Sequence, residues 1–196
     1  QITTIDWSKE RFSGSVNLQW VPPSVTCINI QDNVLIGSID LTVLPQGLED
    51  LYLCRNSLSG EISLTELPNA LGLLDLSENW LCGQISLDRL PETLAYLLLH
   101  KNFFSGTLNL TQLPRFLVEL HLNDNRFEGH IDLTQLPNEL NDLYLQKNLL
   151  EGETDFTQLP HSLYFLNLSH TNLSGEIRIP SQRFYGTEGT NIRVLC

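Results

Sequence analysis

The sequence repeats every 23 residues along almost its whole length. The clearest sign is an asparagine followed four residues later by a glycine, and no insertion or deletion interrupts the period. These pairs are Asn33/Gly37, Asn56/Gly60, Asn79/Gly83, Asn102/Gly106, Asn125/Gly129 and Asn148/Gly152. A strict period of this length predicts a solenoid, in which each unit packs only against its neighbours. The expected architecture is one elongated domain whose function resides on a surface rather than in a catalytic cleft.

Counted from its first leucine, each unit follows the pattern L-x-x-L-x-L-x-x-N-x-[L/F]-x-G-x-I-x-L-x-x-L-P-x-x. The L-x-L core has period two and predicts a strand with both leucines facing inward. A second alternation after the glycine, such as Ile62/Leu64, predicts a short strand on the opposite side of each coil. Only a few residues separate this second strand from the next proline, so the fold class is mainly β, with few or no helices.

The asparagine of each unit is predicted to be buried at a bend, where its amide satisfies backbone groups that the bend leaves unpaired. Stacked units would form a structural ladder of Asn33, Asn56, Asn79, Asn102, Asn125 and Asn148. We expect residues 1–179 to form eight repeat units, the first and last incomplete. Residues 180–196 are expected to form a C-terminal cap, with a final strand over 191–195; a linker is the alternative.

Composition excludes several classes of function. A formal charge of −12 is opposite to the basic surface that nucleic-acid binding requires. No apolar run is long enough to span a membrane. The repeat positions of Cys27 and Cys54 place them on adjacent strands too far apart for a disulfide, so free thiols are expected.

The strict L-x-x-L-x-L-x-x-N motif, carried by nearly the whole chain, is identified as that of leucine-rich repeat proteins. The N-x-[L/F]-S-G-x-I segment, as in 56–62, resembles the plant-type subclass of extracellular receptors and polygalacturonase inhibitors. The Asp-Leu-Thr-x-Leu-Pro segment, as in 40–45 and 132–137, is similar to repeats in surface and secreted proteins of protists, especially kinetoplastids. The resemblance implies a right-handed superhelix with a concave parallel sheet and short convex strands. It also implies binding of macromolecules, without enzymatic activity or cofactors.

Side chains beside the strand leucines should point away from the core, and they vary from unit to unit, unlike the core positions. Large apolar and aromatic residues alternate there with carboxylates, which is typical of a binding surface. The candidate ligand-binding residues are Tyr52, Leu73, Asp75, Tyr96, Leu98, His100, Glu119, His121, Tyr144 and Phe165. We therefore expect a recognition module for a protein or a glycan. The alternative is a structural spacer or adhesion stalk, in which the aromatic residues merely suit strands.

Other side-chain combinations give weaker evidence of a functional site. His100 and His121 fall on adjacent strands but on a diagonal of about 7–8 Å, and Glu119 and Tyr144 do not complete a ligand set, so no metal or catalytic site is predicted. Three glycosylation sequons begin at Asn109, Asn167 and Asn172. With the resemblance, they favour an extracellular or cell-surface location over a cytoplasmic one.

One further column, immediately before the asparagine, alternates in charge along most of the chain. We expect it to form a ladder of surface ion pairs between neighbouring coils. Its members are Lys9, Asp32, Arg55, Glu78, Lys101, Asp124, Lys147 and His170.

Overall fold

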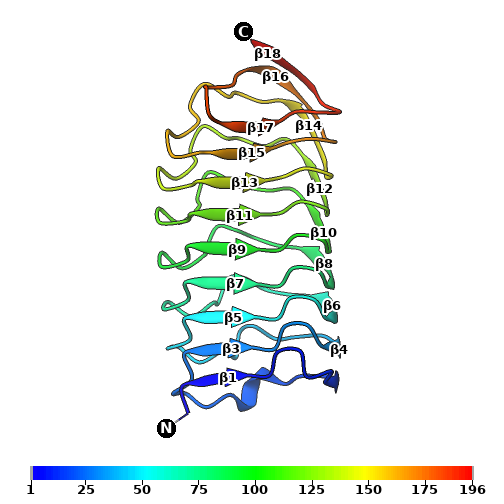
Figure 1. The fold of residues 1–196 in the computed structure, drawn as a ribbon, viewed down its shortest axis with the longest axis vertical. Coiled ribbons are helices and arrows are strands. Elements are labelled where there is room, and N and C mark those ends of the chain that lie inside the picture. The colour runs from blue at the N-terminus through cyan, green and yellow to red at the C-terminus, as the bar shows by residue number, and fades with distance from the viewer. Residues whose placement is uncertain (1, 196) are drawn as a thin grey trace.

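The computed structural model describes residues 2–195 as a β-solenoid of successive coils, as Figure 1 shows. Each coil contributes one strand to each of two parallel sheets of nine strands. The one helical element in the described residues is a short 3₁₀ turn, Leu18–Trp20. The predicted fold class, a β-solenoid of parallel sheets with essentially no helices, is therefore confirmed.

The first sheet is formed by the L-x-L segments, and its strands pair in chain order. It contains β1 (Thr4–Asp6), β3 (Cys27–Asn29), β5 (Asp50–Tyr52), β7 (Leu73–Asp75), β9 (Tyr96–Leu98), β11 (Glu119–His121), β13 (Asp142–Tyr144), β15 (Phe165–Asn167) and β17 (Phe184–Gly186). Leu51 pairs with Leu74, and Leu74 with Leu97, so the inward leucines stack in register. All three are fully buried and form the spine of a single core.

The second sheet lies along another side of the coils (Figure 1). It contains β2 (Ser13–Gly14), β4 (Val34–Gly37), β6 (Ser57–Glu61), β8 (Trp80–Gln84), β10 (Phe103–Gly106), β12 (Arg126–Gly129), β14 (Leu149–Glu153), β16 (Asn172–Arg178) and β18 (Asn191–Leu195). Its register differs from the repeat period, because Ser59 pairs with Trp80 rather than with Cys82, its equivalent in the next unit. Equivalent positions in this sheet are therefore offset from one coil to the next.

The second strands do not lie where the sequence pattern placed them. The prediction from Ile62/Leu64 was wrong: the strand of that coil is β6, which ends at Glu61 and whose one buried residue is Leu58. Ile62 and Leu64 are buried as expected. The equivalent segment of the preceding coil shows the physical reason, since the backbone N–H of Thr42 donates to Asp40 Oδ1 at 2.9 Å. Such local turns curl the chain away from the extended geometry that strand pairing requires.

The column before the asparagine combines charge alternation with unusual backbone geometry. Arg55 lies 3.6 Å from Asp32 and 3.5 Å from Glu78, and Lys101 lies 3.3 Å from Glu78, so the predicted ion-pair ladder is present in these coils. Every residue of the column also has a left-handed backbone, with φ between 54° and 61°. The sequence pattern does not predict this conformation, because most of these residue types have no preference for it.

The C-terminal segment continues both sheets. β17 pairs with β15, and β18, which matches the strand expected at 191–195, pairs with β16. A capping role for residues 180–196 stays a prediction. Cys27, Cys54 and Cys82 have free thiols, while Cys196 lies outside the described residues. No helix in residues 2–195 has the length and apolar character needed to cross a lipid bilayer.

Candidate functional site

The ten candidate ligand-binding residues all lie on the outer side of the first sheet or directly after one of its strands. Their neighbours in the chain are the buried leucines, so the period-two alternation of each strand turns them away from the core. Most are partly exposed, and Tyr96 is the most open, with 37% of its surface accessible. Asp75 differs, since it is buried and accepts hydrogen bonds from Ser77 N at 3.0 Å and Ser77 Oγ at 2.6 Å. Its Oδ1 therefore stabilises a local turn.

Five rings form a continuous series across the first sheet, which we call the aromatic row: His100, His121, Tyr144, Phe165 and Phe184. Successive ring centroids are 5.7, 4.4, 6.4 and 5.2 Å apart. At its C-terminal end, Tyr144, Phe165 and Phe184 line a shallow pocket of about 310 Å³. Ring contacts of this kind fix the side-chain conformations and present a firm apolar surface. Within residues 2–195, no ring pair joins Tyr52 or Tyr96 to this row.

Phe184 was missed by the sequence analysis, although it is the most exposed member of the row at 57%. It pairs in register with Phe165, a place that the repeat period assigns to Glu188, so the shortened last coil moves it out of the repeat columns. Tyr164 was missed as well, and its ring lies 4.8 Å from Phe165 and 5.3 Å from Phe184. The sequence does show two adjacent aromatic residues, Phe184 and Tyr185, a few positions before the expected final strand, and these could have indicated an extension of the binding surface.

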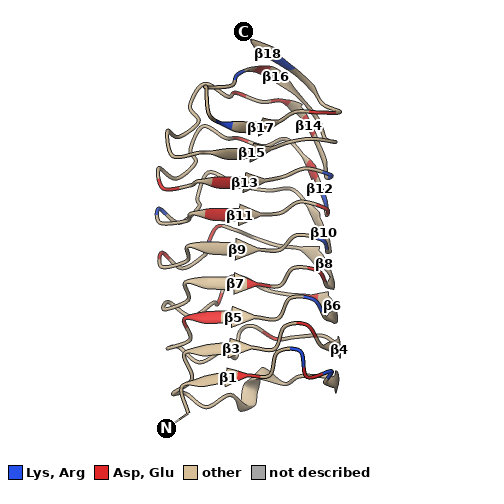
Figure 2. Ribbon diagram, in the orientation of Figure 1, with Lys and Arg blue, Asp and Glu red and all other residues tan. Residues whose placement is uncertain are grey.

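The first sheet carries negative charge without compensating cations. Asp50, Glu119 and Asp142 lie on its strands, and Figure 2 shows red segments at these positions. No Lys or Arg occurs within any of its nine described strands. The surface is therefore suited to a partner that brings its own positive charge.

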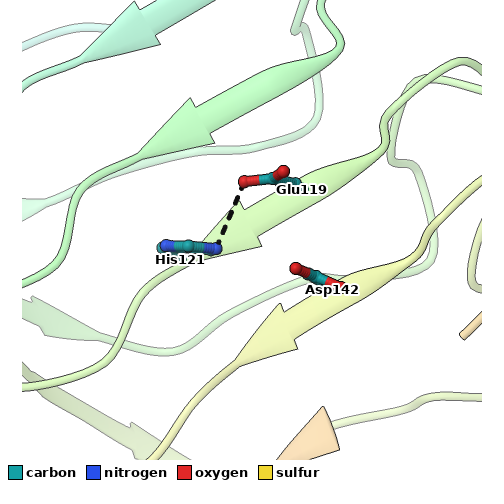
Figure 3. Close-up of side chains that lie close together, drawn as sticks. All are labelled: Glu119, His121 and Asp142. Carbon is teal, nitrogen blue, oxygen red and sulfur yellow. Dashed lines mark ion pairs between the residues drawn. The ribbon is translucent and has the colours of Figure 1, made fainter. Parts of the chain in front are cut away.

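A cluster of titratable groups lies on the adjacent strands β11 and β13 of this sheet, shown in Figure 3. Glu119 Oε2 and His121 Nε2 are 3.5 Å apart, and Asp142 pairs in register with Glu119 on the next strand. Burial raises the pKa of Glu119, with a further contribution from the charge of Asp142, and burial also raises the pKa of Asp142. Burial, together with the charge of His100, lowers the pKa of His121 to about 4. The imidazole of His121 is therefore neutral at pH 7.

The asparagine ladder supplies the scaffold beneath this surface. All six asparagines are buried. In a representative coil, Asn56 Nδ2 donates to Ile30 O of the preceding coil at 3.0 Å and to Leu53 O of its own at 3.1 Å. Asn56 Oδ1 accepts from Leu35 N at 3.1 Å. Each amide therefore holds neighbouring coils together from inside the solenoid.

The three sequon asparagines occupy different environments. Asn109 is exposed, but its amide nitrogen donates to Asp88 Oδ1 at 2.8 Å and its oxygen accepts from Thr111. Asn167 is half-buried on the first sheet, and Asn172 is exposed on β16. Glycosylation at any of them stays a prediction.

The repeat motif and the two stacked parallel sheets together define the class of protein: the chain folds as a leucine-rich repeat solenoid. No protein-family model and no curated protein matches the chain. Solved structures do match it. One is a plant ice-binding protein, with 22% identity and a TM-score of 0.66 over 95% of this chain and 63% of that one.

Two receptors also match. The TDR receptor shows 19% identity and a TM-score of 0.59, covering 98% of this chain and 38% of that one. The Arabidopsis receptor kinase HAESA, in complex with the peptide hormone IDA and a co-receptor, shows 25% identity and a TM-score of 0.56. The match covers 91% of this chain and 36% of the HAESA chain. This chain therefore spans less than two thirds of each of the three matched chains. The likenesses establish the fold.

Proposed function

We propose that this chain is a non-enzymatic recognition module that binds a protein segment on the outer side of the first sheet. The observation that carries the proposal is the aromatic row beside carboxylates that lack cationic partners. The positions beneath this surface repeat from coil to coil, whereas the surface positions do not. Stability alone asks only for strand-compatible residues there, so the concentration of rings and carboxylates favours binding over a purely structural spacer.

The chemistry of the surface indicates which kind of partner would bind. Tyr144, Phe165 and Phe184 offer aromatic faces, which bind apolar side chains and also cations. Asp50, on β5, adds negative charge on the same sheet. A partner segment that carries Lys or Arg next to an apolar residue would satisfy both features. The HAESA structure supports this proposal, since a solenoid of the same fold is seen there with a peptide hormone. On the same basis we propose an extracellular or cell-surface location.

A displayed library of random peptides tests the proposal. The purified chain is used to select binders, and the enriched peptides are measured against two matched double variants. Tyr144→Ala/Phe165→Ala alters the aromatic row, whereas Phe103→Ala/Leu149→Ala removes two exposed apolar side chains from the second sheet. We expect enriched peptides to combine Lys or Arg with apolar residues and to bind the first variant at least tenfold more weakly.

The second variant should retain the affinity of the unmodified chain for the same peptides. Equal weakening in both variants would contradict the assignment of the binding surface. A failure to enrich any peptide would favour the alternative, a spacer whose surface has no partner. Measurements with and without a chelator keep this test independent of metal ions.

A further inference from the structure

Side chains of three residue types that bind metals lie close together on β11 and β13 of the first sheet (Figure 3). Glu119, His121 and Asp142 each offer one ligand atom, and the three atoms lie within 4.8 Å of one another. We propose that these residues bind a divalent transition-metal ion, for which Zn²⁺ is the best fit. From the sequence, His100, His121, Glu119 and Tyr144 did not form a complete ligand set; Asp142 is the residue missing from that set.

The strand geometry explains why the three groups meet. Glu119 and His121 are two residues apart on β11, so both point to the same side of the sheet. Asp142 lies directly opposite Glu119 on β13. The separation of 3.5 Å between Glu119 Oε2 and His121 Nε2 is close to the roughly 3.3 Å expected between two ligands of a tetrahedral ion with bonds of about 2.0 Å. Rotation of the side chains would bring the remaining ligand atoms, which lie within 4.8 Å of one another, to this separation.

Unsatisfied polar atoms supply a second, independent observation. His121 Nε2 and Asp142 Oδ1 are buried and have no hydrogen-bond partner in the described part of the chain. Buried polar atoms without partners are uncommon in folded proteins and call for an explanation. Within residues 2–195, the closest group of opposite character to Glu119 Oε2 is the neutral His121 Nε2, and their separation of 3.5 Å is too long for a good hydrogen bond. A bound cation would contact all three groups and offset the repulsion between the two carboxylates.

The donor set selects the class of metal. His121 offers the Nε2 lone pair of its imidazole as a nitrogen ligand, and this atom lies within 4.8 Å of the ligand atoms of Glu119 and Asp142. One imidazole and two carboxylates suit Zn²⁺ and related transition metals, whereas Ca²⁺ takes only oxygen ligands. Tyr144 packs edge-on against His121, with ring centroids 4.4 Å apart, and so holds the imidazole in place. Three protein ligands leave coordination positions open toward the outer side of the sheet.

The inference does not depend on a protein partner, and titration calorimetry of the full chain with ZnCl₂ tests it. After chelator treatment and dialysis at neutral pH, we expect one Zn²⁺ to bind per chain. His121→Ala and Glu119→Gln should each weaken binding at least tenfold. The matched controls His130→Ala and Glu128→Gln change exposed residues of the same types away from the cluster and should leave affinity unchanged.

Two further measurements distinguish this site from metal binding by the cysteine thiols. A Cys27→Ser/Cys54→Ser variant should bind Zn²⁺ as the unmodified chain does, and the Co²⁺ complex should lack thiolate-to-metal charge-transfer bands. Circular dichroism verifies that each variant is folded. No detectable Zn²⁺ binding, unchanged binding by both site variants, or equal losses in the control or cysteine variants would each overturn the proposal.

Discussion

Single residues of this chain differ in whether the solenoid itself satisfies their polar atoms. Asn79 donates to Leu53 O and Leu76 O and accepts from Leu58 N, so both ends of its amide are used by the fold. His121 Nε2 and Asp142 Oδ1 are also buried, yet they have no such partner within residues 2–195. The first kind of residue holds neighbouring coils together. The second kind lies on the outer side of the first sheet, and we infer a bound metal ion from its unpaired polar atoms.

Replacing Asn79 by Ala tests the scaffold role. The substitution leaves backbone groups of two coils without partners, and each unsatisfied buried group costs about 1–3 kcal/mol. We expect the free energy of unfolding to fall by about 3 kcal/mol in urea titrations. Asn69→Ala is the matched control, because Asn69 is exposed. A loss no larger than that of the control would show that the ladder is dispensable.

The lowered pKa of His121 predicts a pH dependence of stability. An unfolded histidine titrates near its ordinary value of 6.5, so between that pH and about 4 the unfolded state binds more protons than the folded state. Stability should therefore fall as pH decreases through this window, by up to about 3 kcal/mol from His121. Urea titrations from pH 7 to pH 4 measure the effect. His121→Gln should flatten the profile; an equally steep profile in this variant would refute the assignment.

Among elements, the first-sheet strands were predictable and the second-sheet strands only in part. Leu51 and Leu53 alternate with outward residues, and periodicity alone places β5. Ile62 and Leu64 alternate in the same way and are also buried, but no strand forms over them. Periodicity reports which side chains are inside, whereas strand pairing depends on backbone hydrogen bonds, which local turns such as Asp40–Thr42 redirect.

The same distinction applies to the candidate site. The outward columns follow from strand periodicity, so Glu119, His121 and Tyr144 could be assigned to one surface. The distance between Asp142 and His121 depends on side-chain rotamers, which the repeat sequence does not specify. Phe184 was not predicted as a surface residue because its coil is shorter than the repeat period. Register errors of this kind arise wherever a repeat ends.

The residues immediately before each asparagine have a left-handed backbone, and this conformation predicts how substitutions affect the turn that follows each first-sheet strand. Lys101 has φ of 54°, a conformation that costs a residue with a Cβ about 1–2 kcal/mol and that β-branched residues tolerate worst. We expect Lys101→Val to be less stable than Lys101→Gly by about that amount. Both variants lose the ion pair with Glu78, so the difference measured in urea isolates the backbone. Equal stabilities would contradict the strain argument.

The whole molecule is organised in one dimension. Within residues 2–195, strands contact only their neighbours in the same sheet, so a coil in the middle of the stack touches the coil before it and the coil after it. Stability is then a sum of contributions from coils and the interfaces between them. Such a stack can hold a long row of surface groups in fixed register, which is the requirement for recognising an extended partner.

Because coupling passes only between neighbours, a defect in a central coil should weaken the molecule locally. Leu97 is fully buried and stacks in register between Leu74 and Leu120, so Leu97→Ala leaves a cavity with a cost of about 2–5 kcal/mol. Hydrogen exchange followed by mass spectrometry should show the greatest loss of protection in β7, β9 and β11. Protection in β1 and β15, several coils away, should change least. An equal loss in every strand would instead show that the solenoid opens only as a single cooperative unit.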